Sequence, residues 1–252
     1  MSVHTEVDGA VATAVIDRPE ARNAMTMAMY DALAEFCEQV DANPSVRVAV
    51  IRGAGGKAFV AGTDINHFRG FSAADGVEYE RHIESVLARL EQVAVPTIAA
   101  VEGYATGGGL SIAAACDLRI CTPAARFGLP IARTLGNCVS MPTYARLTHL
   151  IGAARTLHLI YTAAFVDGAE AVRIGLASEL AEDVDTRLAE LCVQLAAHAP
   201  LTMQASKIAL RRLRTHLLPP DEDLIRRCYG SEDFHEGVTA FLEKRPPHWQ
   251  GR

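Results

Sequence analysis

The sequence lacks the cysteine patterns of disulfide-rich and metal-binding proteins. Its six cysteines include no C-x-x-C pair, and no histidines accompany them at ligand spacing. Such cysteines are typical of reduced, mostly buried thiols, so we expect a cytoplasmic protein that holds no metal. No apolar stretch is long enough to span a bilayer. Residues 1–20 have neither the basic start nor the apolar run of a signal peptide, so we expect no membrane association.

The sequence also has fewer basic residues than acidic ones. The 24 Lys and Arg residues stand against 30 Asp and Glu, a net charge of −6, and the basic residues are scattered. This distribution argues against a nucleic-acid partner. The one local cluster, "RRLR" (Arg211 to Arg214), stands among apolar residues at helical spacing, and we predict that it forms a solvated helix face.

Strand and helix signals alternate in the first half of the chain. Short apolar runs predict strands at 11–19, 46–53, 95–103 and 117–121, and Asp8-Gly9 predicts a hairpin before the first of them. Thr26 is the expected N-cap of one helix, and an apolar stripe over 83–90 indicates another. Residues 54–68 are predicted to be a loop. From Leu147 onward the signals are almost all helical, so we expect an α/β core followed by a helical region.

Two glycine-rich segments match familiar motifs incompletely. "GAGGKA" (53–58) has the spacing of a dinucleotide-binding loop, but the helix that this loop requires does not follow. "GLSIA" (109–113) is one residue short of the nucleophile elbow of a serine hydrolase, in which Ser111 would be the nucleophile. Ser111 falls inside the helix that the glycines begin, not on a turn directly after a strand, which makes this a remote alternative.

A third interpretation takes two loops together. "AFVAGTDI" (58–65) and "YATGGG" (104–109) each place small residues between a buried strand and a helical turn. Backbone N–H groups at helix starts are unpaired and carry partial positive charge. Two such groups that converge form an oxyanion hole, and glycine or alanine lets a substrate carbonyl approach them.

These loops and several further motifs, in this order, resemble the crotonase (enoyl-CoA hydratase/isomerase) superfamily over nearly the whole chain. The further motifs are "IDRPEARNAM", "CDLRICTPAARFGLP", "GAEAVRIGLASEL" and "TAFLEKRPPHW". The resemblance implies a spiral of ββα units over residues 1–195. It implies a C-terminal helical region, 196–252, that packs on the core and on neighbouring subunits of a homotrimer or dimer of trimers. The implied substrate is an acyl-CoA thioester, with coenzyme A as part of the substrate and no covalently bound cofactor.

The resemblance also assigns residues to roles. The backbone N–H groups of Thr63 and Gly108 would hold the thioester oxygen. The residues expected to bind the substrate and its coenzyme A are Arg22, Ala24, Ala61, Gly62, Asp64, Ile65, Gly107, Pro130, Arg133, Phe241 and Lys244.

The chain departs from the hydratase pattern at the two catalytic glutamates. Ser111 and Ile131 occupy their positions, and neither side chain can exchange protons usefully near neutral pH. Each loss is expected to cost about a hundred- to ten-thousandfold in rate.

Three other residues could supply the missing chemistry. They are Glu84, Cys138 and Ser140, and each also has an ordinary structural interpretation, as a solvated carboxylate, a buried thiol or a weak hydroxyl. Arg133 could pair with a substrate carboxylate or form a structural ion pair.

The expected function is therefore acyl-CoA chemistry through a thioester enolate, as a lyase or isomerase of the kind found in fatty acid metabolism. The competing hypothesis is a nearly inactive homologue that binds CoA thioesters.

Overall fold

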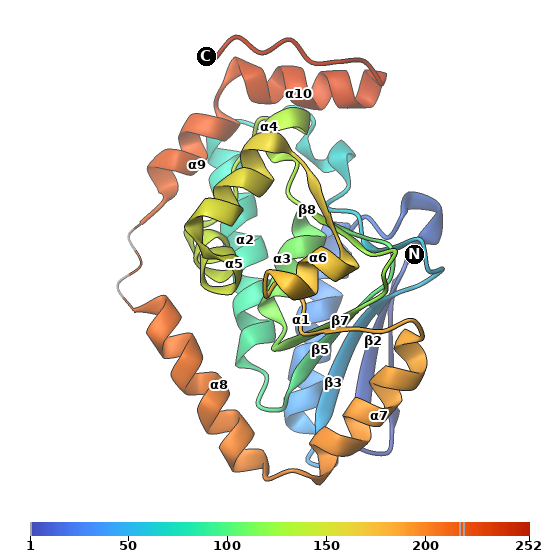
Figure 1. Ribbon diagram of the computed structural model, residues 1–252. Helices are drawn as coiled ribbons and strands as arrows, with labels where there is room; N and C mark the ends of the chain where they lie inside the picture. Colours follow the sequence, from blue (N-terminus) through green and yellow to red (C-terminus); the bar gives the residue numbers. More distant parts are fainter. Residues whose placement is uncertain (1, 217, 219) are drawn as a thin grey trace.

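Two β-sheets form the centre of the molecule (Figure 1). The computed structural model describes residues 2–216, 218 and 220–252. The larger sheet has the strand order β1-β2-β3-β5-β7-β10 and the smaller one β4-β6-β8-β9. The strands of the larger sheet are β1 (Ser2–Asp8), β2 (Val11–Asp17), β3 (Val48–Gly53), β5 (Thr97–Val101), β7 (Leu118–Cys121) and β10 (Glu179–Leu180).

The larger sheet confirms the strands predicted in the first half of the chain. β1 and β2 pair antiparallel across the Asp8-Gly9 turn, where Gly9 adopts a φ of 56°. The pairs β2–β3, β3–β5, β5–β7 and β7–β10 are parallel. Parallel strands are buried on both faces, which is why these segments read as continuous apolar runs.

Helices cover both faces of this sheet. Val48, Val50 and Ile98 point to one face, where they pack against α7 (Val184–Ala197). Ala49 and Ile51 point to the other face, toward the main core formed with α1 (Met27–Ala42), α2 (Ala73–Gln92) and α3 (Gly108–Ala115). The alternation follows from the two-residue period of a strand.

The helix starts follow local sequence signals. Thr26 caps α1 as predicted, because its hydroxyl accepts a hydrogen bond from the Met29 N–H. Ser72 and Asp75 form a capping box at the start of α2. The predicted apolar stripe of α2 is buried from Ile83 to Leu90.

The prediction of a plain loop over residues 54–68 was wrong. This segment contains a short strand, β4 (Ala58–Val60), and a 3-10 helix, η2 (Ile65–Phe68). β4 pairs with β6 (Tyr104–Thr106), which pairs with β8 (Arg126–Gly128), and β9 (Phe165–Asp167) closes the smaller sheet. β9 and β10 are short exceptions to the almost entirely helical structure expected after Leu147. Three-residue strands give too few alternations to be read from periodicity.

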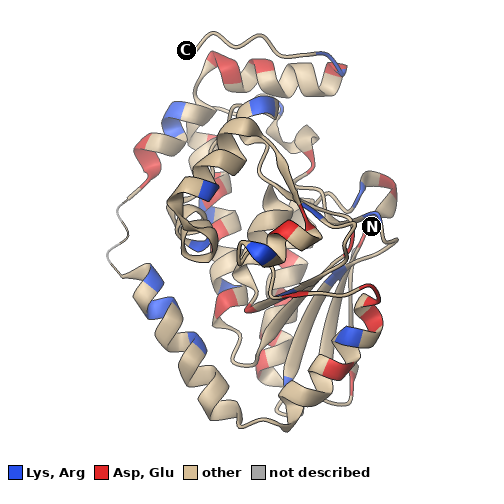
Figure 2. Ribbon diagram, in the orientation of Figure 1, with Lys and Arg blue, Asp and Glu red and all other residues tan. Residues whose placement is uncertain are grey.

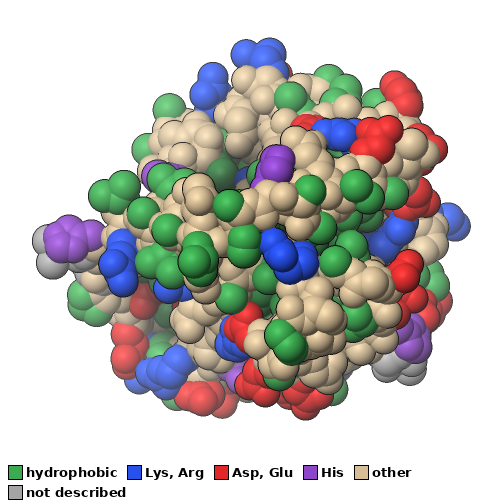
Figure 3. Space-filling view, turned by 90° about the horizontal axis from the view of Figure 1, so that it is seen from below, with side chains coloured by type: hydrophobic (Ala, Val, Ile, Leu, Met, Phe, Trp, Pro, Cys, Tyr) green, Lys and Arg blue, Asp and Glu red, His purple; other side chains and the backbone are tan. Residues whose placement is uncertain are grey.

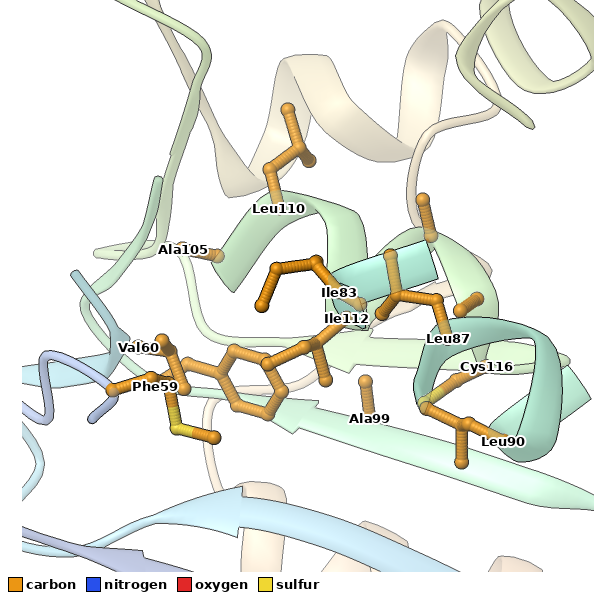
Figure 4. Close-up of a cluster of buried hydrophobic side chains, with 14 of the residues drawn as sticks. Phe59, Val60, Ile83, Leu87, Leu90, Ala99, Ala105, Leu110, Ile112 and Cys116 are labelled. Carbon is orange, nitrogen blue, oxygen red and sulfur yellow. The ribbon is translucent and has the colours of Figure 1, made fainter. Parts of the chain in front are cut away.

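Small side chains bring α3 close to its neighbours. Its Ala113 and Ala115 are buried, and a β-carbon at Gly109 would lie 2.0 Å from the Val60 carbonyl oxygen. Figure 4 shows α3 and the side chains of α2 and β5 meeting in one apolar cluster. Its labelled members are Phe59, Val60, Ile83, Leu87, Leu90, Ala99, Ala105, Leu110, Ile112 and Cys116. This packing fixes the N-terminus of α3 against the end of β4.

The remaining helices lie mostly in the C-terminal half (Figure 1). They are η1 (Pro19–Ala21), α4 (Ile131–Thr134), α5 (Met141–Thr162, kinked at Gly152), α6 (Gly168–Arg173), α8 (Pro200–Thr215), α9 (Glu222–Tyr229) and α10 (Glu232–Glu243). α9 packs on α2, and α10 packs on η2. None of the described helices is both long and apolar enough to cross a membrane.

The "RRLR" cluster of α8 does not form the solvated face predicted for it. Arg214 turns inward and pairs with Glu91, whereas Leu213 is exposed. In Figure 2 the Lys and Arg residues of α8 lie toward the C-terminal end of the helix. Seen from below, the surface carries many apolar side chains between charged ones (Figure 3), and α8 contributes Leu201, Leu210 and Leu213 to the exposed apolar residues.

Candidate active site

Two loops meet at one edge of the smaller sheet. β4 and β6 are neighbouring parallel strands, so the residues that follow them, Gly62-Thr63 and Gly107-Gly108, emerge side by side. A β-carbon at Gly107 would lie 3.6 Å from the Gly62 Cα. Gly107 has φ 55° and ψ −122°, a conformation that glycine adopts readily. The loops therefore touch through bare backbone.

Each loop contributes a backbone N–H without a backbone acceptor in the described part of the chain. Met25 donates to the Gly62 carbonyl and Asp64 donates to the Met25 carbonyl, both at 2.8 Å. In this parallel bridge the Thr63 N–H points away from Met25. Gly108 is the first residue of α3, so its N–H has no partner within the helix. The two amides of the predicted oxyanion hole are thus available as donors.

Two tyrosines hold the Thr63 side chain. Its Oγ1 lies 2.9 Å from the Tyr30 hydroxyl and 2.7 Å from the Tyr79 hydroxyl, and all three side chains are buried. Burial raises the pKa of Tyr30 to about 12, so the phenol stays neutral and keeps its proton for hydrogen bonding. Neither tyrosine was given a role at the site from the sequence.

A cavity of about 150 Å³ opens beside these loops. Its wall is mostly apolar and comes from both loops, α2, α3, α4 and α10. The lining residues are Ala61, Gly62, Thr63, Ile65, Phe68, Tyr79, Glu80, Ile83, Thr106, Gly107, Gly108, Ser111, Pro130, Ile131, Thr134, Leu135, Asn137, Val139, Thr143 and Phe241. Ten of the residues assigned to the site from the sequence are among them.

A wider cavity of about 600 Å³ adjoins the first, since both are lined by Ala61, Thr63, Ile65, Thr106 and Phe241. Arg22, Ala24 and Asp64 also line it. Arg18 pairs with Asp64 at 2.8 Å. Although burial opposes it, this hydrogen bond helps hold the pKa of Asp64 below its usual range. The arrangement offers a broad, open approach to the small inner cavity.

Ser111 and Ile131 both face the inner cavity. Ser111 is buried in α3, and its hydroxyl donates to the Gly107 carbonyl at 3.3 Å. No histidine or carboxylate hydrogen-bonds to this hydroxyl within the described residues, so the pair needed for a serine nucleophile is not assembled there. Ile131 is the first residue of α4 and adds a purely apolar surface.

The candidate residue Glu84 lies outside the inner cavity. It pairs with Arg146, with N–O distances of 2.5 and 2.8 Å, and accepts a hydrogen bond from the Ser140 hydroxyl at 2.9 Å. Ser140 also caps α5. Both side chains are therefore occupied in a buried polar network that includes Glu91, which Arg146 contacts at 2.9 Å.

The other candidates also lie off the cavity wall. Cys138 is buried, and the hydrogen bond with Cys228 together with burial raises its pKa, so it is a neutral thiol and a poor nucleophile. Arg133 is exposed on α4. Lys244 is exposed just after α10, whereas Phe241, one turn earlier, lines both cavities.

The structure adds one residue that the sequence analysis missed. Glu80 is the only charged side chain among the described residues that line the inner cavity. It is buried, and its Oε1 accepts a hydrogen bond from the Tyr229 hydroxyl at 2.6 Å. Burial raises the pKa of Glu80 to about 8. The available signal was its position three residues after Val77 and three before Ile83, on the apolar stripe of α2.

Comparison with known proteins shows the family to which the chain belongs. The model of the enoyl-CoA hydratase/isomerase family matches residues 6–252. The short-chain-enoyl-CoA hydratase of Clostridium acetobutylicum is 33% identical over 250 residues, covering 97% of this chain and 95% of that protein. The chain therefore belongs to the enoyl-CoA hydratase/isomerase family, within the crotonase superfamily.

Solved structures agree in fold. An enoyl-CoA hydratase/carnithine racemase from Magnetospirillum magneticum is 31% identical with a TM-score of 0.81, covering 99% of this chain and 96% of that one. A methylmalonyl-CoA decarboxylase complexed with 2S-carboxypropyl-CoA is 26% identical with a TM-score of 0.91, covering 99% of this chain and 98% of that one. The predicted crotonase-like α/β architecture is confirmed.

Proposed function

We propose that this protein is an acyl-CoA enzyme that stabilises a thioester enolate between the amides of Thr63 and Gly108. The observation that carries the proposal is the pair of unpaired N–H groups on touching loops beside a small apolar cavity. Two convergent backbone donors favour negative charge on an oxygen placed between them, and they need no rearrangement during the reaction. Membership of a family that acts on CoA thioesters supports the same substrate class.

The two cavities suit the two ends of such a substrate. The inner cavity, of about 150 Å³ and mostly apolar, would take a short acyl group. The wider cavity, with Arg22, Ala24 and Asp64, would take the pantetheine and nucleotide. Phe241 would close over the junction, and Lys244, which follows the same helix, would lie near the nucleotide phosphates. Coenzyme A would thus enter as part of the substrate.

Hydration by a pair of glutamates is not expected. With Ser111 and Ile131 in their places, one water molecule cannot be deprotonated on one side while the α-carbon is protonated from the other. We expect lyase or isomerase chemistry that uses the enolate differently. The absent glutamates also favour a second candidate, a homologue that binds CoA thioesters with little turnover.

Titration calorimetry with butyryl-CoA and with free coenzyme A tests the substrate class. We expect butyryl-CoA to bind more tightly, because only the thioester carbonyl can accept hydrogen bonds from Thr63 and Gly108. Equal affinity for the two ligands, or no binding, would contradict the proposed oxyanion hole. Crotonyl-CoA hydration, followed by loss of enone absorbance, should be slower than for ordinary hydratases by about a hundredfold or more.

A homotrimer or dimer of trimers is the proposed assembly. The exposed Leu201, Leu210 and Leu213 of α8 support it, since apolar side chains on one helix are typical of a surface that another subunit covers. Light scattering should give three or six times the 27.0 kDa of one chain. A monomer at micromolar concentration would contradict this assembly.

A further inference from the structure

A buried carboxyl group faces the proposed enolate site from α2. Glu80 lines the same inner cavity as Thr63 and Gly108, and only 6% of its surface is exposed. The hydratase positions 111 and 131 contribute a hydroxyl and an alkyl group to this wall. Among the described lining residues, Glu80 therefore stands alone as a side chain that could exchange a proton with a bound substrate near neutral pH.

The surroundings of Glu80 are built to hold it. The Tyr229 hydroxyl donates to Glu80 Oε1 at 2.6 Å, and Asn137 Nδ2 donates to the same hydroxyl at 3.3 Å. Room for Tyr229 depends on Gly76, one turn before Glu80, because a β-carbon there would lie 2.2 Å from the Tyr229 ring. Burial raises the pKa of Tyr229 well above its usual range, so this phenol remains a donor.

A second observation points to a bound molecule at this place. Asn137 lines the inner cavity, and its Oδ1 is buried with no hydrogen-bond partner among the residues that the structure describes. An unpaired buried acceptor is costly. A hydrogen-bond donor of a bound molecule in the cavity could therefore be accepted beside the chain Glu80–Tyr229–Asn137.

Several groups set the proton affinity of Glu80. Burial raises its pKa, the hydrogen bonds from Tyr229 and from the Ser140 N–H lower it, and the charges of Glu84 and Asp221 raise it again. The nearby phenols of Tyr30 and Tyr79 and the thiol of Cys138 also face it, and the pKa of each is raised, so they stay neutral. With a pKa of about 8, both forms of Glu80 are accessible at physiological pH.

We propose that Glu80 is the general acid–base of this site, moving a proton to and from the α-carbon of the bound acyl-CoA. The proposal rests on the proposed function, since it needs a thioester between Thr63 and Gly108. The Glu80 carboxylate takes the α-hydrogen as a proton. The C–H electron pair forms the enolate double bond, and the carbonyl π-pair moves onto the thioester oxygen. Return of the proton reverses each change.

The outer side of Glu80 offers a route for protons. Glu80 also lines a separate cavity of about 290 Å³, together with Arg81, Glu84, Ser140 and Asp221. Its carboxyl group can therefore exchange protons with solvent on one side and serve the substrate on the other. Tyr229 is a positioning residue in this scheme, because it contacts Glu80 and does not line the inner cavity.

Exchange of α-hydrogens for deuterium tests this role without knowledge of the complete reaction. The full-length protein is incubated with propionyl-CoA or butyryl-CoA in D₂O, and deuterium uptake is followed by mass spectrometry. Glu80→Gln should lower the exchange rate by about a hundredfold or more, with acyl-CoA affinity within about threefold of wild type. Glu78→Gln is the matched control, because Glu78 lies on the same helix with an exposed side chain paired to Arg81.

The pH profile separates a catalytic from a structural role. Because the carboxylate is the base, wild-type exchange should rise with pH and level off above about 8. Tyr229→Phe removes a hydrogen bond that favours the carboxylate, so the midpoint should move to higher pH while the plateau persists. Tyr229→Phe keeps the ring that packs on Gly76. If Glu80→Gln does not fold, the pH midpoint of Tyr229→Phe tests the role of Glu80.

The outcomes distinguish this inference from the function on which it rests. Exchange by Glu80→Gln within threefold of wild type, or an unshifted midpoint in Tyr229→Phe, would overturn the role of Glu80 and leave the proposed function intact. Wild-type protein that binds the thioesters without exchange would overturn proton transfer by Glu80 and favour the binding homologue. Absence of thioester binding would overturn the proposed function itself.

Discussion

The Tyr30 hydroxyl occupies the space next to Gly108 so closely that a β-carbon at position 108 would lie 2.3 Å from its oxygen. The same hydroxyl is hydrogen-bonded to Thr63 Oγ1. One phenol from α1 thus contacts both loops of the proposed oxyanion hole. The glycine is required here because the phenol leaves no room for a side chain, in addition to any need for a carbonyl to approach the backbone.

Gly108→Ala should therefore disturb both amides together. The new methyl group must displace Tyr30 or the start of α3, and either movement changes the geometry of Thr63 and Gly108. We expect a loss of about a hundredfold or more in α-hydrogen exchange, comparable to the removal of one oxyanion donor. Adding Tyr30→Phe, which removes the obstructing oxygen, should restore part of the rate. An equally impaired double variant would mean that Tyr30 does not set the clearance.

Gly109→Ala provides the contrasting case. Its β-carbon would lie 2.0 Å from the Val60 carbonyl oxygen, a backbone atom that no second substitution can remove. We expect a loss of stability of about 1–3 kcal/mol or more, as for an overpacked core, measured by urea unfolding. A Gly109→Ala protein as stable as wild type would show that β4 and α3 can separate without cost.

Much of the larger sheet could be predicted because its signals are local. The Asp8-Gly9 turn, the Thr26 cap and the apolar runs of β3 and β5 each act within a few residues. The smaller sheet could not be found in the same way. β4 owes its strand conformation to pairing with β6, more than forty residues later along the chain.

The site was predictable only where backbone motifs define it. The glycine loops predicted a pair of converging amides, and the family resemblance assigned them to Thr63 and Gly108, which lie on touching loops. Glu80 was not among the candidates from the sequence. Glu84, one helical turn later, was one of three candidates, and it pairs with Arg146, whereas Glu80 lines the cavity. Glu84 is distinguished from Glu80 by its ion pair with Arg146, which lies 62 residues later in the chain. A local sequence pattern cannot predict such a long-range contact.

Arg146 should be a major determinant of stability. Its guanidinium group is buried between Glu84 and Glu91, at 2.5 and 2.9 Å. Arg146→Met would leave Glu84 without its cationic partner and Glu91 with Arg214 alone. We expect a loss of about 3–5 kcal/mol in the free energy of unfolding. Adding Glu84→Gln and Glu91→Gln should recover much of that loss. If the single variant unfolds at the wild-type denaturant concentration, the network carries no net stability.

The same network should weaken in acid. Although burial opposes it, Arg146 and Arg214 hold the pKa of Glu91 below its usual range. Its ionised form therefore stabilises the fold above the unfolded-state pKa, and this contribution is lost as pH falls through the folded-state value. Urea midpoints between pH 6 and pH 3 should fall less steeply in Glu91→Gln than in wild type. Parallel curves would contradict the assignment.

Restoring the hydratase carboxylates should restore hydration. Ser111→Glu with Ile131→Glu places two carboxyl groups in the wall of the inner cavity. We expect crotonyl-CoA hydration to rise by about tenfold or more over wild type, and each single variant to gain less, because the two groups act on one water. No gain in the double variant would mean that the cavity is shaped for a different acyl group.

Glu80 should leave a signature in stability that is independent of any substrate. Its pKa is raised from 4.5 to about 8 by burial, so between these values the folded protein holds a proton that the unfolded chain has released. The stability that depends on the neutral form of Glu80 is therefore fully present below about pH 4.5 and is lost as pH rises through about 8. Glu80→Gln cannot ionise, so its stability relative to wild type should increase over this range by a few kcal/mol, on the order expected from linkage.

Urea unfolding of wild type, Glu80→Gln and Glu78→Gln from pH 5 to pH 9 measures that difference. The Glu78→Gln curve should run parallel to wild type, because the Glu78 side chain is exposed on the surface of α2. A Glu80→Gln curve that is also parallel would show that the Glu80 carboxyl ionises normally in the folded protein. The plateau of exchange would then begin well below pH 8, which contradicts the pH profile expected for Glu80 as the base.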